Sequence, residues 1–148
     1  MQEEKVAGAS YLLTFLSDIE FLIAYASSYI NLYVHLKNKY TEESLQKYDI
    51  EDSEKKSLME TINQLRSIIF KVYVRFNALT KQIKEFKTYK KEIKKYYEKI
   101  IPKDKSDSFV PLVEDVENFV IKINEIFVEA IMSELIVKSR EILKGLTE

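Results

Sequence analysis

Hydrophobic positions in the middle of the chain recur at alternating steps of four and three residues. The repeat runs without a slip over six heptads, from Leu58 to Ile100, and Lys90 is its one charged member. This spacing is typical of a helix that packs against other helices, and no strand produces it. The members of this central seam are Leu58, Ile62, Leu65, Ile69, Val72, Phe76, Leu79, Ile83, Phe86, Lys90, Ile93, Tyr97 and Ile100.

The central seam predicts one helix over about 54–100, which Pro102 ends. No Gly or Pro interrupts this range. The alternative is a break near Thr88 and Tyr89, because β-branched and aromatic residues are weaker helix formers.

Two further heptad seams flank the central one. The first predicts a helix over about 3–39, and the last predicts a helix over about 108–145, with Ser108 as N-cap, Pro111 in the first turn and Gly145 near its end. The first seam consists of Leu12, Phe15, Ile19, Leu22, Ala26, Tyr29, Tyr33, Leu36 and Tyr40. The last consists of Val113, Val116, Val120, Ile123, Phe127, Ile131, Leu135, Ile142 and Leu146.

The connections between these segments are polar and short. An acidic linker, 40–53, has room for one helical turn, and the second linker is 102–107. Short connections favour antiparallel neighbours. We therefore predict a single all-α domain, 1–148, in the form of an antiparallel bundle of three long helices with coiled-coil-like heptad packing. A broken central helix that folds back gives four.

Apolar residues also occur outside the seams. They cover most of the circumference of the central helix near Val74, and the last helix has a similar excess. A helix that is apolar nearly all round needs neighbours on more than one side. We therefore expect a self-association or partner surface at Phe70, Tyr73, Val74, Val128, Met132 and Ile136. The alternative is that a folded-back fourth helix covers these residues.

Charge is concentrated in one stretch of the chain. Residues 81–105 contain ten Lys and four acids, although the whole chain has a net charge of −1. A basic face of this kind is able to follow a phosphate backbone, with tyrosines that stack on unpaired bases. The candidate nucleic-acid contacts are Lys84, Lys87, Tyr89, Lys91, Lys94, Lys95 and Tyr96. The alternatives are a solvated face neutralised by its own acids, cover from the acidic last helix, or an acidic protein partner.

Residues that carry chemistry are scarce. The chain has no Cys, one His (His35), two Gly and two Pro, which excludes thiolate and multi-histidine metal sites and glycine-rich phosphate loops. We expect no catalytic, cofactor-binding or metal-binding residue and no small-molecule substrate, and so a protein that is not an enzyme.

The sequence also favours a location. The longest charge-free apolar stretch, Phe21 to Leu36, falls short of the roughly 20 residues that a membrane-spanning helix needs. No basic start precedes an apolar run as in a secretion signal. We therefore expect a cytoplasmic protein without a membrane contact. The richness in Lys and Glu is typical of hyperthermophile proteins, and a low-GC mesophile has the same bias.

Together these features predict a non-enzymatic helical protein-interaction module, which acts as an oligomer or as a small subunit or inhibitor of a larger assembly. The alternative function is an RNA- or DNA-binding accessory subunit that uses the basic face of 81–105.

Overall fold

Helices account for nearly all of the chain that the structure describes. The computed structural model describes residues 2–101 and 109–147, with side chains at 12–84, 86–101, 109–132 and 139–146. The helices within these ranges are α1 (Gln2–Lys37), α2 (Glu42–Gln46), α3 (Asp52–Leu79), α4 (Lys84–Lys87), α5 (Lys90–Ile100) and α6 (Val113–Thr147). The described residues include no strand. The predicted all-α bundle is confirmed.

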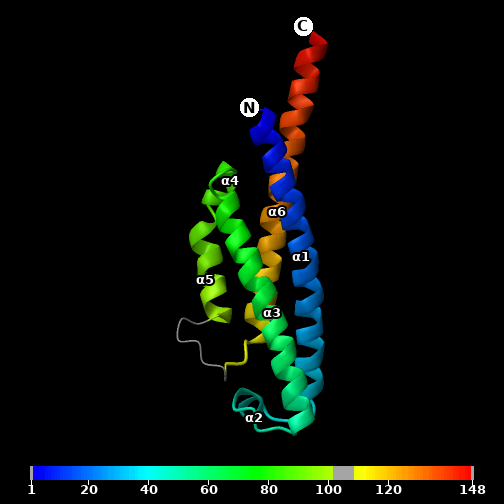
Figure 1. The fold of residues 1–148 in the computed structure, drawn as a ribbon, viewed down its shortest axis with the longest axis vertical. Coiled ribbons are helices and arrows are strands. Elements are labelled where there is room, and N and C mark those ends of the chain that lie inside the picture. Colours follow the sequence, from blue (N-terminus) through cyan, green and yellow to red (C-terminus); the bar gives the residue numbers. More distant parts are fainter. Residues whose placement is uncertain (1, 102–108, 148) are drawn as a thin grey trace.

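Four of these helices run alternately up and down. α1 descends from the N-terminus, α3 returns beside it, α5 descends again and α6 ascends (Figure 1). α1 packs mainly on α3 and α6, and α5 packs on α6 and α3. Among the described residues, the long helices of the bundle are therefore α1, α3, α5 and α6, and the central segment contributes two of them.

The first two predicted seams supply most of the core, and the last supplies part of it. Leu58, Phe76, Phe86 and Ile100 of the central seam are buried, and its exceptions are Lys90, which is exposed, and Ile83 and Tyr97, which are half-buried. In α1 the seam from Phe15 to Leu36 is buried throughout.

In α6 Val116, Ile123 and Phe127 of the predicted seam are buried, together with Phe119, Ile126 and Ala130, which lie outside it. Val113 and Val120 are half-buried, and the side chain of Leu135 lies outside the described residues. The prediction is wrong for Ile131, Ile142 and Leu146, which are exposed, because beyond Ala130 the described residues on the inward line of the helix are charged.

The prediction of one helix over 54–100 is wrong, because the chain reverses after Leu79. The Thr80 hydroxyl donates to the Asn77 carbonyl at 2.6 Å, and the amides of Gln82 and Ile83 both donate to the Leu79 carbonyl, at 3.0 and 2.8 Å. These bonds close the end of α3 and turn the chain toward α4. A second interruption, between α4 and α5, falls at Thr88 and Tyr89, where the sequence predicts a break.

α6 begins five residues later than the predicted start at 108. The segment before it is held by side chains from three other helices: Arg66 donates to the Phe109 carbonyl, Gln46 to the Val110 carbonyl and Tyr29 to the Pro111 carbonyl. These three consecutive carbonyls therefore accept hydrogen bonds from side chains. The first hydrogen bond of α6 runs from the Val116 amide to the Leu112 carbonyl. Pro111 precedes the helix instead of lying in its first turn, and Ser108 is outside the described residues.

The acidic linker contains the expected helical turn. The Thr41 hydroxyl accepts a hydrogen bond from the Ser44 amide and so caps α2, and Leu45 anchors α2 in the core. Beside it, Glu54 at the start of α3 accepts bonds from Lys39 and Tyr40. The linker 102–107 lies outside the described residues. Across the described ranges, no helix combines the length and the apolar character that crossing a bilayer requires.

Candidate interaction surfaces

A groove lies between α1 and α3. Phe21 and Tyr25 of α1 form one wall, with their rings stacked at 6.5 Å between centroids. Polar residues of α3 and the buried Ile68 line the rest. Because one wall is aromatic and the other polar, the groove is able to contact an apolar side chain and satisfy hydrogen bonds beside it. The α3 residues that line the groove are Asn63, Gln64, Ser67, Ile68 and Lys71.

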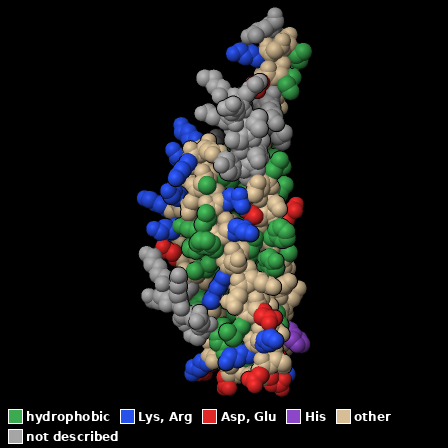
Figure 2. Space-filling view, in the orientation of Figure 1, with side chains coloured by type: hydrophobic (Ala, Val, Ile, Leu, Met, Phe, Trp, Pro, Cys, Tyr) green, Lys and Arg blue, Asp and Glu red, His purple; other side chains and the backbone are tan. Residues whose placement is uncertain are grey.

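The groove continues onto the outer face of α3. Ser67 and Lys71 line both the groove and a second shallow depression, which also contacts Phe70, Val74, Arg75 and Ala78. Phe21 and Phe70 are each 55% exposed, and Val74 is 49% exposed. We call the set Phe21, Tyr25, Ser67, Phe70, Lys71 and Val74 the α1–α3 surface. Figure 2 shows hydrophobic side chains at several places on this face, with basic side chains between those at mid-height.

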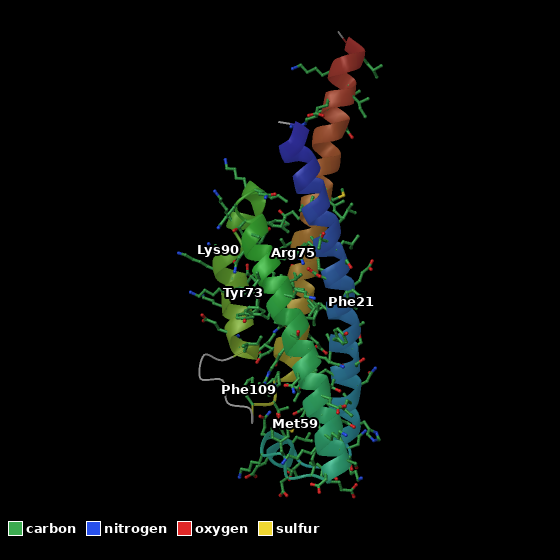
Figure 3. All side chains as sticks on the ribbon, in the orientation of Figure 1. Phe21, Met59, Tyr73, Arg75, Lys90 and Phe109 are labelled. Carbon is green, nitrogen blue, oxygen red and sulfur yellow. The ribbon has the colours of Figure 1, made fainter. Side chains whose placement is uncertain are left out.

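An ion pair borders this surface. Arg75 Nε lies 2.5 Å from Asp18 Oδ2, and Asp18 is buried while Arg75 is about one-third exposed. The pair joins α3 to α1 (Figure 3 shows Arg75 on α3). It fixes the two helices on which the α1–α3 surface depends.

A third group of exposed apolar residues follows the outer face of α6. This α6 stripe consists of Ile121, Val128, Met132, Ile142 and Leu146, all at least half exposed. At 100° per residue it lies opposite the core positions Phe119, Ile123 and Ala130. α6 is therefore apolar on two opposite faces.

The predicted interface residues are dispersed among these places. Phe70 and Val74 belong to the α1–α3 surface, and Val128 and Met132 to the α6 stripe. Tyr73 is half-buried instead, because its ring stacks on Tyr97 of α5. The side chain of Ile136 lies outside the described residues.

The predicted nucleic-acid residues occupy one edge of the bundle. Lys84, Lys87, Lys91, Lys94 and Lys95 are exposed, and Lys90 extends the same edge. We call these six the basic edge. Figure 2 shows their basic side chains projecting over α4 and α5, and Figure 3 labels Lys90 among them. Within the described part of the chain none of the six forms an ion pair.

The two predicted stacking tyrosines are less available than the lysines. The Tyr89 hydroxyl donates to Glu129 of α6, and this hydrogen bond, followed by burial, raises the pKa of Tyr89. Lys122 of α6 lies 5.2 Å from the centre of the Tyr89 ring and 3.3 Å from Glu92. Tyr96 is half-buried, with Lys99 at 6.0 Å from its ring centre. Tyr89 therefore serves the contact between α5 and α6.

Some surface residues escaped the sequence prediction. Phe21, Tyr25 and Ile121 lie one or two positions outside the heptad seams, where a seam-based reading assigns no role. A count of apolar residues opposite each seam finds Ile121, because it lies in line with Val128 on the helix. Phe21 needs the neighbouring helix, since its groove exists only where α3 packs on α1.

Side chains that ligate metals are dispersed over the described part of the chain. No group of three or more His, Cys, Asp or Glu side chains within them is placed to hold a metal ion. His35 is exposed near the end of α1. Comparisons with family models, with characterised proteins and with solved structures found no match to this chain. The functional argument therefore depends on the surfaces.

Proposed function

We propose that this chain is a non-enzymatic helical protein that acts through protein–protein contact, as an oligomer or as a small subunit or inhibitor of a larger assembly. One observation carries the proposal: eight of the fifteen large apolar side chains that are exposed among the described residues lie on two surfaces, the α1–α3 surface and the α6 stripe. Scattered exposed hydrophobic residues are ordinary on monomers, whereas contiguous apolar patches are typical of interaction sites.

The energies indicate how much surface a stable complex needs. Burying such a side chain completely contributes about 1.5–3 kcal/mol, so covering the exposed halves of Phe21, Phe70 and Val74 gives about 2–4.5 kcal/mol. Association costs about 4–15 kcal/mol in lost freedom. The α1–α3 surface alone therefore does not offset that cost. Adding the five members of the α6 stripe raises the gain to about 6–12 kcal/mol, which matches that cost.

The test places one charge on each surface. Val74→Asp and Met132→Asp are compared with Asn31→Asp, which adds the same charge at an exposed polar position of α1. Light scattering over a concentration series measures self-association, and native purification detects a retained partner. We expect at least one of the first two variants to weaken association while Asn31→Asp leaves it unchanged. A chain that stays monomeric and retains no partner, or whose association ignores both variants, would refute the proposal.

A second function is favoured by the basic edge, whose lysines form no ion pair with the side chains that the structure describes. If neighbouring acids neutralised these lysines, ion pairs would form along the edge. Glu92 of α5 instead contacts Lys122 of α6. The edge therefore offers its positive charge to an anionic polymer such as RNA or DNA. The engagement of Tyr89 with Glu129 argues that such binding is electrostatic and depends little on base stacking.

Salt dependence separates this function from the first. Affinity for single- and double-stranded oligonucleotides is measured across a salt series for the parent and for a variant with Lys87, Lys91, Lys94 and Lys95 changed to Gln. Each lost phosphate contact lowers the slope of log K against log salt by about 0.9 on duplex DNA, so we expect a decrease of about 3–4. The control changes the exposed Lys37 and Lys56 to Gln. Absence of binding by the parent at low salt eliminates this function.

A further inference from the structure

The apolar face of α6 changes sides along the helix. Up to Ala130 the inward positions are buried and apolar. Beyond it, the described residues on the same line are Glu141 and Lys144, and the large exposed residues Ile142, Leu143 and Leu146 lie on the outer side. Figure 1 shows this end of α6 extending past the N-terminus of α1 and past the other helices. Ile142 and Leu146 are therefore exposed on the outer face of this extension.

The α6 stripe has the spacing of a coiled-coil seam. Its members, Ile121, Val128, Met132, Ile142 and Leu146, follow one another at seven, four, ten and four residues. Each interval is a sum of threes and fours in alternation, so the five positions share one heptad register over 26 residues. The intermediate positions of this register are Glu125, Leu135 and Ser139, so two of its eight positions are polar. A surface with this register fits another helix that carries the same register.

We propose that the α6 stripe pairs with the α6 stripe of a second copy of this chain, with the two helices antiparallel. This inference rests on the proposed function and names the partner for one of its surfaces. A two-fold symmetric interface requires a self-complementary patch, and a heptad seam on one face of a helix is such a patch. The two-fold axis repeats every contact, so each residue of the stripe is covered in both copies.

The charges of α6 favour the antiparallel direction. Where the two stripes overlap in the antiparallel direction, 121–129 of one copy lies along 138–146 of the other. The first range contains two acidic and one basic residue, a net charge of −1, and the second contains three basic and one acidic residue, a net charge of +2. Parallel helices would place like charges of the two copies together, which is destabilising.

The shape of the bundle agrees with this direction. The extension of each copy lies along the outer face of the other copy's α6, where Ile121 and Val128 are exposed. The register that covers the whole stripe places Ile121 opposite Leu146 of the other copy. It also places Val128 opposite Ser139 of the other copy. In each pair the two opposed residues have different sequence positions. Each pair can therefore be tested separately with two single variants.

Cysteine cross-linking provides the test, because the chain has no native cysteine. Ile121→Cys and Leu146→Cys are prepared as full-length proteins and oxidised alone and as an equimolar mixture, and Val128→Cys and Ser139→Cys are treated likewise. All four positions are exposed, so the folds are retained. Disulfides need Cβ atoms about 3.5–4.5 Å apart. We expect each mixture to cross-link at least about five times faster than either variant alone, and Asn31→Cys to report the collision rate.

The outcomes separate this inference from the proposed function. Cross-linking of each variant with itself indicates parallel helices and overturns the antiparallel arrangement. Mixtures that react at the Asn31→Cys rate overturn the pairing of α6; if Val74→Asp still weakens association, the proposed function stands. A second measurement is the dimer dissociation constant of Met132→Glu, which we expect to rise by roughly tenfold or more because a charge enters the centre of the seam. An unchanged constant also overturns the pairing.

Discussion

The ring of Tyr73 lies parallel to the ring of Tyr97, with the centroids 4.0 Å apart and the planes 7° apart. Tyr73 belongs to α3 and Tyr97 to α5, so the contact joins the two helices into which the central heptad segment divides (Figure 3 labels Tyr73 between them). Burial, followed by the neighbouring Tyr73, raises the pKa of Tyr97. The contact explains why a residue expected at an interface is directed inward.

The first prediction concerns the strength of this stack. A double-mutant cycle with Tyr73→Ala, Tyr97→Ala and the double variant should give a coupling of about 0.5–1.5 kcal/mol, because stacked aromatic pairs contribute this much beyond their buried area. Urea unfolding followed by circular dichroism measures it. The matched cycle pairs Tyr97→Ala with Phe70→Ala, which lies on the outer face of α3 and should give a coupling near zero.

The second prediction concerns Asp18 and Arg75. Asp18→Ala should lower the free energy of unfolding by about 1–3 kcal/mol, since a nearly buried hydrogen bond between charged groups is lost. Glu20→Ala, at an exposed position two residues away, should change it by less than about 0.5 kcal/mol. If the two variants unfold at the same denaturant concentration, the ion pair does not fix α1 to α3.

The heptad pattern predicts the core well but not the path of the chain. Leu79, Ile83 and Phe86 continue the 3.5-residue spacing straight through the reversal. Each half of the segment buries its own share of the seam, so the spacing is the same whether the helix continues or folds back. The turn depends instead on local bonds, such as the Thr80 hydroxyl to the Asn77 carbonyl, which substitute for helical ones.

The surfaces are less predictable than the core for a similar reason. Val74 and Met132 are recognisable from sequence as apolar residues opposite a seam, because periodicity gives the face of a single helix. Tyr73 and Phe21 are not, because their environments are set by the neighbouring helix. The start of α6 likewise depends on Tyr29, Gln46 and Arg66, which approach from distant parts of the chain.

The third prediction concerns pH. Glu54 accepts a hydrogen bond from Lys39 at 2.6 Å, and this bond lowers the pKa of Glu54 below its ordinary value of about 4.3. The folded state therefore favours the ionised carboxylate, and its stabilising contribution is present at neutral pH. It is lost as the pH falls through the lowered pKa, when the folded state also takes up the proton.

The measurement is the urea midpoint of the parent and of Glu54→Gln between pH 2 and 7. The variant should be less stable above about pH 5, and the difference should shrink to nothing at the acid end. Glu60→Gln, at an exposed position in the same helix, serves as the control. A difference between parent and Glu54→Gln that is independent of pH would show that Glu54 acts by packing and not by its charge.

The last prediction contrasts two buried tyrosines one turn apart on α1. The Tyr29 hydroxyl donates to the Pro111 carbonyl, whereas the buried Tyr33 hydroxyl has no hydrogen-bond partner among the described residues. Burial raises the pKa of both phenols, so both remain neutral donors. Tyr29→Phe leaves a buried carbonyl unpaired and should cost about 1–3 kcal/mol, while Tyr33→Phe removes an unpaired polar group and should be neutral or stabilising. The two variants lose the same hydroxyl oxygen, and thermal unfolding measures the stability of each. Equal losses of stability would mean that Tyr29 does not hold the segment before α6.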